Sequence, residues 1–119
     1  MTKLLASISL GFCMIAPASA QSIGGNYTTK GTNLDGSPYS GTVEITLTSE
    51  TTCNIHWVTG GSTSEGICSR NGDAFAAAYV LGNSIGLVVY KVLEDGTLDG
   101  LWTIAGQDGN GTEVLTPAN

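Results

Sequence analysis

Apolar and polar residues alternate in short runs from about residue 23 onward, and no helical period lasts longer than a turn or two. Turn-forming pairs of Gly, Asn and Asp interrupt these runs about every eight to twelve residues, a spacing typical of β-sandwiches and β-barrels. The pattern predicts eight strands, at about residues 23–31, 39–48, 52–59, 62–70, 73–81, 84–93, 97–105 and 111–116.

The clearest hairpin lies at residues 90–102, where Asp95-Gly96 separates two apolar runs. Such a pair is the strongest short-range hairpin signal, because Gly accepts a positive φ. Two turns are compatible with this pattern: a two-residue turn at Asp95-Gly96 and a three-residue turn over residues 94–96. We choose the three-residue turn because it keeps the apolar residues on one face and pairs opposite charges. It also sets Tyr90 over Gly100, where no side chain competes for space.

Four further turns link consecutive strands, at residues 49–51, 59–62, 71–72 and 82–83. Turning at Asn71-Gly72 pairs Arg70 with Asp73 and Cys68 with Phe75. Taken together, the turns put most large apolar residues on one face of the sheet. That face carries Val43, Ile45, Leu47, Cys53, Ile55, Trp57, Cys68, Phe75, Ala77, Tyr79, Val88, Tyr90, Val92, Leu98, Trp102 and Ile104.

A sheet with one apolar face must bury that face, and eight twisted strands can do so by closing on themselves. Because every hairpin is sequential, the simplest topology is a meander. We therefore predict an all-β fold, an eight-stranded antiparallel up-and-down meander that forms a small closed barrel. A sandwich or an open sheet is the alternative.

The first twenty residues have the features of a secretory signal peptide. Lys3 precedes an apolar run over residues 4–15, and Ala18-Ser19-Ala20 supplies the small residues of a cleavage site. The apolar run is shorter than the roughly 20 residues that a membrane span requires. We predict a signal peptide over residues 1–20 and a single barrel domain over residues 21–119, periplasmic or secreted after cleavage near Ala20.

The net charge and the cysteine and histidine content indicate which partners, cross-links and metals to expect. The formal net charge is −6, so we expect no nucleic-acid partner. Cleavage removes Cys13, so two cysteines remain, Cys53 and Cys68, and an even pair in an exported chain predicts a disulfide. The two are equidistant from a turn at Gly60-Gly61. There is one histidine and no C-x-x-C motif, so we expect no metal and no cofactor. The segment from residue 108 to Glu113 offers oxygen ligands for Ca²⁺ but lacks the full EF-hand spacing.

Catalytic signatures are also missing from the sequence. The single histidine, His56, is predicted to point outward opposite Glu65, where the pair is a surface contact. No G-x-S-x-G motif, Walker motif or paired metal ligands occur. We therefore predict that the protein is not an enzyme.

Two surfaces remain as candidates for binding. The outward positions of the fifth to seventh strands are apolar, which is typical of a partner-binding or self-associating face. This outer face comprises Ile67, Ala76, Ala78, Val80, Ile85, Leu87, Val89 and Leu101. The alternative is a small ligand inside the barrel, lined by Trp57, Phe75, Tyr79, Tyr90 and Trp102. Ordinary packing favours a filled interior for so short a chain.

Three segments resemble a family of small exported bacterial proteins that are often described as fibronectin-binding. They comprise Tyr27, Gly31, Asn33, Asp35, Gly36, Tyr39 and Gly41, then residues 90–102, then residues 111–117. The resemblance implies a binding protein and supplies no catalytic residue. The hairpin pattern is also similar to avidin and lipocalin barrels at the level of the fold. The sequence thus predicts an exported, non-enzymatic module that binds a protein or itself, or alternatively carries a small ligand.

Overall fold

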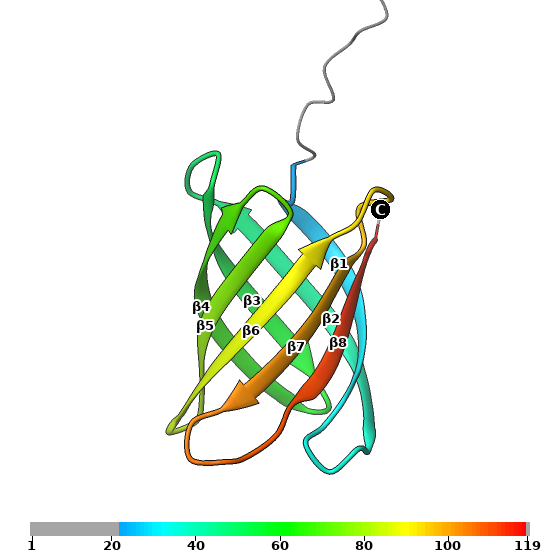
Figure 1. The fold of residues 1–119 in the computed structure, drawn as a ribbon, viewed down its shortest axis with the longest axis vertical. Helices are drawn as coiled ribbons and strands as arrows, with labels where there is room; N and C mark the ends of the chain where they lie inside the picture. The colour runs from blue at the N-terminus through cyan, green and yellow to red at the C-terminus, as the bar shows by residue number, and fades with distance from the viewer. Residues whose placement is uncertain (1–21, 119) are drawn as a thin grey trace, which may run out of the picture.

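The computed structural model describes residues 22–118, so the predicted signal peptide lies outside the described residues. Eight antiparallel strands follow one another and close into a barrel through pairing of the last strand with the first (Figure 1). They are β1 (Gly25–Thr32), β2 (Pro38–Leu47), β3 (Thr52–Thr59), β4 (Ser62–Asn71), β5 (Ala74–Leu81), β6 (Ser84–Val92), β7 (Leu98–Ile104) and β8 (Gly111–Pro117). The predicted fold is confirmed, and every predicted strand end lies within two residues of the observed one.

The hairpin between β6 and β7 has the predicted register, with Tyr90 opposite Gly100. Its turn is closed by the amide of Leu93, which donates to the carbonyl of residue 97 at 2.9 Å, and Gly96 has a φ of 88°. The turn between β1 and β2 repeats this arrangement. There the amide of Asn33 donates to the carbonyl of residue 37 at 2.7 Å, and Gly36 has a φ of 89°.

The register between β4 and β5 differs from the prediction by two residues. Arg70 lies opposite Phe75 rather than Asp73, and Cys68 lies opposite Ala77 rather than Phe75. The two-residue turn is therefore Gly72-Asp73, with a positive φ only at Gly72, as a type II′ turn requires. A slip of two residues keeps every side chain on its own face, so the apolar pattern could not distinguish the two registers.

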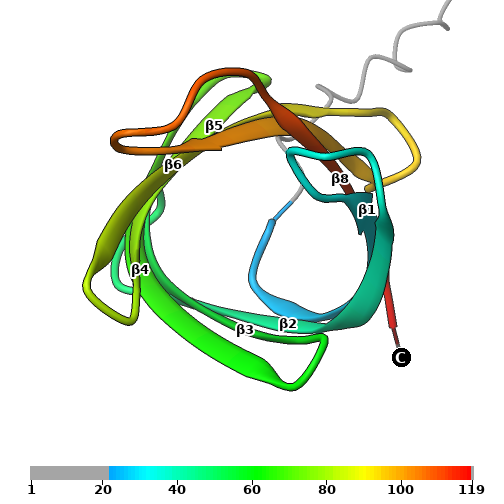
Figure 2. The same cartoon turned by 90° about the horizontal axis from the view of Figure 1, so that it is seen from below.

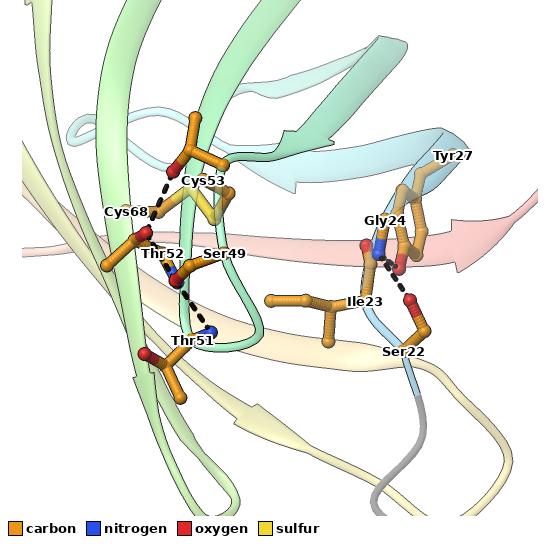
Figure 3. Close-up of a disulfide and its surroundings, with 10 residues drawn as sticks. Ser22, Ile23, Gly24, Tyr27, Ser49, Thr51, Thr52, Cys53 and Cys68 are labelled. Carbon is orange, nitrogen blue, oxygen red and sulfur yellow. Dashed lines mark hydrogen bonds between the residues drawn. A yellow bond between two sulfur atoms is a disulfide. The ribbon is translucent and has the colours of Figure 1, made fainter.

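One end of the barrel is closed by packed side chains. The disulfide between Cys53 and Cys68 joins β3 to β4 there, with 5.0 Å between the two Cα atoms. Figure 3 shows the Ile23 side chain pointing toward this disulfide, and Ile23 is only 3% exposed. The Tyr27 hydroxyl donates to the Ile23 carbonyl at 2.7 Å and holds the segment in place. This end of the interior is thus filled.

The opposite end carries the turns that follow β1, β3, β5 and β7, and Figure 2 views the barrel from that side. The inward side chains of the strands form the core, and they match the predicted face closely. Leu47 is the exception, because it lies at the end of β2 and is 39% exposed. Within residues 22–118, no helix is long and apolar enough to cross a membrane.

Candidate functional site

A cavity of about 210 Å³ lies at the end of the barrel opposite the disulfide. Aromatic side chains form much of its wall, and polar residues of the turns and strand ends form its rim. Its lining residues are Asn33, Tyr39, Trp57, Thr59, Gly60, Ser62, Ser64, Tyr79, Leu81, Val88, Trp102 and Glu113. The prediction of a filled interior therefore holds at the disulfide end and is wrong at this end.

Glycines lie opposite several of the inward aromatic residues. Four inward aromatic rings each cover a glycine that lies directly across on the neighbouring strand, in the space that a Cβ atom would occupy. The pairs are Tyr39 with Gly31, Tyr79 with Gly86, Tyr90 with Gly100 and Trp102 with Gly111. The predicted position of Tyr90 over Gly100 is confirmed. Each of these four rings therefore occupies space that a side chain on the neighbouring strand would otherwise fill.

Two aromatic contacts line the cavity. Trp57 and Tyr79 pack with their ring centroids 5.0 Å apart and an interplanar angle of 54°. Tyr39 and Trp102 make an edge-to-face contact at 6.3 Å. Trp57 and Tyr79 are almost fully buried, whereas Tyr39 and Trp102 are partly exposed nearer the mouth. The cavity therefore presents aromatic surface over its depth.

Among the described residues, Glu113 is the only charged one in the lining, and it is 5% exposed. Its Oε1 accepts a hydrogen bond from the Tyr39 hydroxyl at 2.7 Å. Its Oε2 accepts one from Trp57 Nε1 at 2.8 Å and another from the Tyr90 hydroxyl. The sequence interpretation considered Glu113 only as a calcium ligand of the preceding loop. It instead points into the barrel, because strand alternation puts it on the face of Gly111 and Leu115.

The structure brings together three of the five predicted ligand-lining residues, namely Trp57, Tyr79 and Trp102. Phe75 and Tyr90, the other two, do not line this cavity. Their rings stack on each other at 5.5 Å in the packed part of the core, where they are 0% and 1% exposed. Only the Tyr90 hydroxyl contributes to the site, through Glu113.

Burial and the nearby carboxylate keep the tyrosine hydroxyls protonated. Desolvation, followed by the charge of Glu113, raises the pKa of Tyr79 to about 12. The same two causes raise the pKa values of Tyr39 and Tyr90 above the ordinary value. These hydroxyls therefore stay protonated, and remain hydrogen-bond donors, further into the alkaline range than an exposed tyrosine would.

Among the described residues, the polar side-chain groups of the lining are hydroxyls, one amide, two indole N–H groups and one carboxylate, with no histidine, cysteine or lysine. His56 lies on the outside of β3, where its Nδ1 is 3.8 Å from Glu65 Oε2 and the two side chains are 43% and 81% exposed. No group of potential metal ligands occurs within residues 22–118.

The predicted outer face also lies where the sequence placed it. Six of its members are large apolar residues about half exposed or more, namely Ile67, Val80, Ile85, Leu87, Val89 and Leu101. The registers place these residues side by side, since Ile67 pairs with Ala78, which pairs with Leu87, and Val89 pairs with Leu101. A band of apolar surface therefore crosses β4 to β7.

A scan against protein-family models finds no match for this chain, and a search of curated proteins finds none either. Solved structures do resemble it. A redesigned β-barrel matches with a TM-score of 0.71 at 18% identity, over 84% of this chain and 95% of that one. The redesigned barrel mFAP1, bound to DFHBI, matches with a TM-score of 0.70 at 20% identity, over 82% and 96%.

A de novo designed fluorescence-activating β-barrel matches with a TM-score of 0.66 at 16% identity, over 83% of this chain and 96% of that one. At such identities the likeness shows the fold alone, a small eight-stranded antiparallel barrel. No family match supports the resemblance to fibronectin-binding proteins, which stays a prediction.

Proposed function

We propose that this protein carries a small ligand in the open end of its barrel. The observation that carries the proposal is the cavity itself, since the other end of the same barrel is packed with side chains. Apolar walls with a few convergent polar groups are typical of ligand sites, and the mouths of β-barrels are a common place for them. A barrel of the same fold is bound to DFHBI, which agrees with this use of the fold.

The size of the cavity limits the ligand. Its volume of about 210 Å³ is below the about 300–1,000 Å³ of pockets for drug-sized compounds. The ligand is therefore small, with about one ring. The hydroxyls of Thr59, Ser62 and Ser64 are available at the mouth to orient it.

The two tryptophans provide the test, because both Trp57 and Trp102 line the cavity and the chain has no other. We expect single-ring compounds such as benzyl alcohol to change tryptophan fluorescence in a saturable way. Ser64→Phe, which points into the cavity, should abolish the change. Ser69→Phe, on the outside of the same strand, should keep it. An unresponsive wild type, or equal responses in both variants, would contradict the proposal.

A second function is favoured by the outer face. We propose that the apolar band over β4 to β7 binds a protein partner or a second copy of this chain, because exposed apolar surface of this extent marks interaction sites. Leu87 lies near its middle and is 49% exposed. Light scattering should find a dimer or larger species that Leu87→Glu converts to a monomer. The control Thr46→Glu, outward on β2, should leave the mass unchanged. A wild-type monomer at every concentration would rule out self-association.

We also propose that fibronectin is the protein partner of the outer face and that the protein is exported. Immobilised fibronectin should retain the wild-type protein and release Leu87→Glu if this outer face is the binding surface. If both proteins are retained equally, or if neither is retained, fibronectin does not bind to this outer face. The disulfide between Cys53 and Cys68 supports an oxidising compartment, in agreement with a periplasmic or secreted location.

A further inference from the structure

We infer that the cavity selects a small organic cation, an ammonium group attached to about one ring, over neutral and anionic compounds of the same shape. The inference deepens the proposed carrier function and rests on it. Three features of the site lead to this class of ligand: its charge, its acceptor sites and its aromatic walls.

The first feature is a carboxylate without a positive partner among its hydrogen-bond donors. Glu113 is 5% exposed, and its three donors, Tyr39, Trp57 and Tyr90, are all neutral groups. No basic residue in the described part of the chain, residues 22–118, lines the cavity. Because a buried charge is costly unless it is paired, a cation entering the cavity would gain the interaction that the protein itself does not supply there.

The second feature is the distribution of hydrogen bonds over the carboxylate. A carboxylate accepts about four hydrogen bonds through its two oxygens. Oε2 accepts two, from Trp57 and Tyr90, whereas Oε1 accepts one, from Tyr39. One acceptor site therefore remains on Oε1. Tyr39 and Glu113 both line the cavity, so an N–H donor of a bound ammonium ion has an acceptor within the site.

The third feature is the aromatic wall. Trp57, Tyr79, Tyr39 and Trp102 surround the cavity in two contacting pairs. Aromatic faces attract ammonium groups through their quadrupoles, and the attraction is strongest in desolvated sites. The net charge of −6 adds a long-range field that concentrates cations near the protein. An anionic ligand would be repelled by Glu113, by the aromatic faces and by the net charge of the protein.

Three probes that share one phenyl ring but differ in charge test the inference: benzylammonium, benzyl alcohol and benzoate. Comparing them separates the effect of ligand charge on affinity from the effect of ligand shape. Each is titrated into the wild-type protein and followed by tryptophan fluorescence and calorimetry. We expect benzylammonium to bind about tenfold or more tightly than benzyl alcohol and benzoate to show no binding. High salt should weaken benzylammonium and leave benzyl alcohol unchanged.

Glu113→Gln tests the origin of the preference. The amide oxygen can take the place of Oε2 and accept from Trp57 and Tyr90, while the amide nitrogen donates to the Tyr39 hydroxyl. The variant thus keeps the shape of the site and removes its charge, and near-ultraviolet circular dichroism checks that its aromatic packing is retained. It should bind benzylammonium and benzyl alcohol equally. Glu65→Gln, an exposed carboxylate on β4, should keep the wild-type preference.

The outcomes distinguish the two proposals. If none of the three probes binds the wild-type protein, both the carrier function and the cation preference fail. If benzyl alcohol or benzoate binds as tightly as benzylammonium, the carrier function stands and the cation preference is overturned. Because this comparison uses the wild-type protein, it does not depend on whether Glu113→Gln folds.

Discussion

The indole Nε1 of Trp57 donates a hydrogen bond to Glu113 Oε2 at 2.8 Å, across the interior of the barrel. Trp57 belongs to β3 and Glu113 to β8, two strands that are not neighbours in the sheet. Tyr39 on β2 and Tyr90 on β6 donate to the same carboxylate. One side chain therefore connects four strands, and it sits where the packed core ends and the cavity begins.

Replacement of Glu113 should destabilise the fold in proportion to the hydrogen bonds lost. Glu113→Leu leaves Trp57 Nε1, which can only donate, without an acceptor, and should lower the free energy of unfolding by about 2–4 kcal/mol. Glu113→Gln keeps an acceptor and loses charge assistance, at about 1–2 kcal/mol. Urea unfolding measures both variants. Glu44→Gln, an outward carboxylate on β2, should change stability by less than about 0.5 kcal/mol. A Leu variant as stable as the wild type would show that the network does not stabilise the barrel.

The sequence predicted the barrel because turns and alternation agree. Turns such as Glu94-Asp95-Gly96 each fix one register, and each register puts the next strand's apolar residues on the same face. Closure follows, because that face has to be buried. The two-residue difference in register between β4 and β5 was not predicted, because alternation indicates which face Arg70 lies on but not which residue lies opposite it.

The site was only partly predictable. Trp57, Tyr79 and Trp102 were found because large aromatic residues on an inward face either pack or line a cavity. Glu113 was missed, although alternation with Leu115 on the predicted eighth strand assigns it to the inner face. A buried carboxylate is expected only where donors converge on it. Those donors come from β2, β3 and β6, far away in the sequence, so local patterns could not reveal them.

The glycines beneath the aromatic rings should separate ligand binding from stability. In Gly86→Ala the added Cβ would overlap the Tyr79 ring, which borders the cavity and can shift into it. We expect weaker binding of benzyl alcohol with a stability loss of about 1 kcal/mol. In Gly100→Ala the added Cβ meets Tyr90, which is stacked on Phe75 and cannot move.

Gly100→Ala should therefore cost more, about 2–3 kcal/mol, and change ligand affinity less. Tryptophan fluorescence titration and urea unfolding of the two variants provide the comparison. The reverse order, with the Gly86 variant less stable and the Gly100 variant weaker in binding, would mean that the cavity and the packed core are wrongly assigned.

The disulfide should contribute to stability and leave ligand binding unchanged. Cys53 and Cys68 are separated by 15 residues, and closing a loop of this length stabilises a fold by about 3 kcal/mol in the chain-entropy model. The double variant Cys53→Ala with Cys68→Ala should lose about this amount in urea unfolding. Because the disulfide lies at the opposite end of the barrel from the cavity, binding of benzyl alcohol below the unfolding transition should match the wild type. A large loss of affinity in the folded double variant would contradict the separation of the two ends.

Alkaline pH should unfold the barrel through its tyrosines. Burial and, to a smaller extent, the charge of Glu113 together raise the pKa of Tyr79 from 10.0 to about 12. Between these values the unfolded chain has released a proton that the folded chain keeps, so raising the pH favours unfolding. The tyrosine contribution to stability should thus be fully present at neutral pH and be lost progressively between pH 10.0 and about 12. Glu113→Gln should show a shallower fall, because one cause of the raised pKa is removed. Unfolding free energies and tyrosinate absorbance measured over this range would test both statements, and tyrosines that ionise near pH 10.0 in the folded protein would refute them.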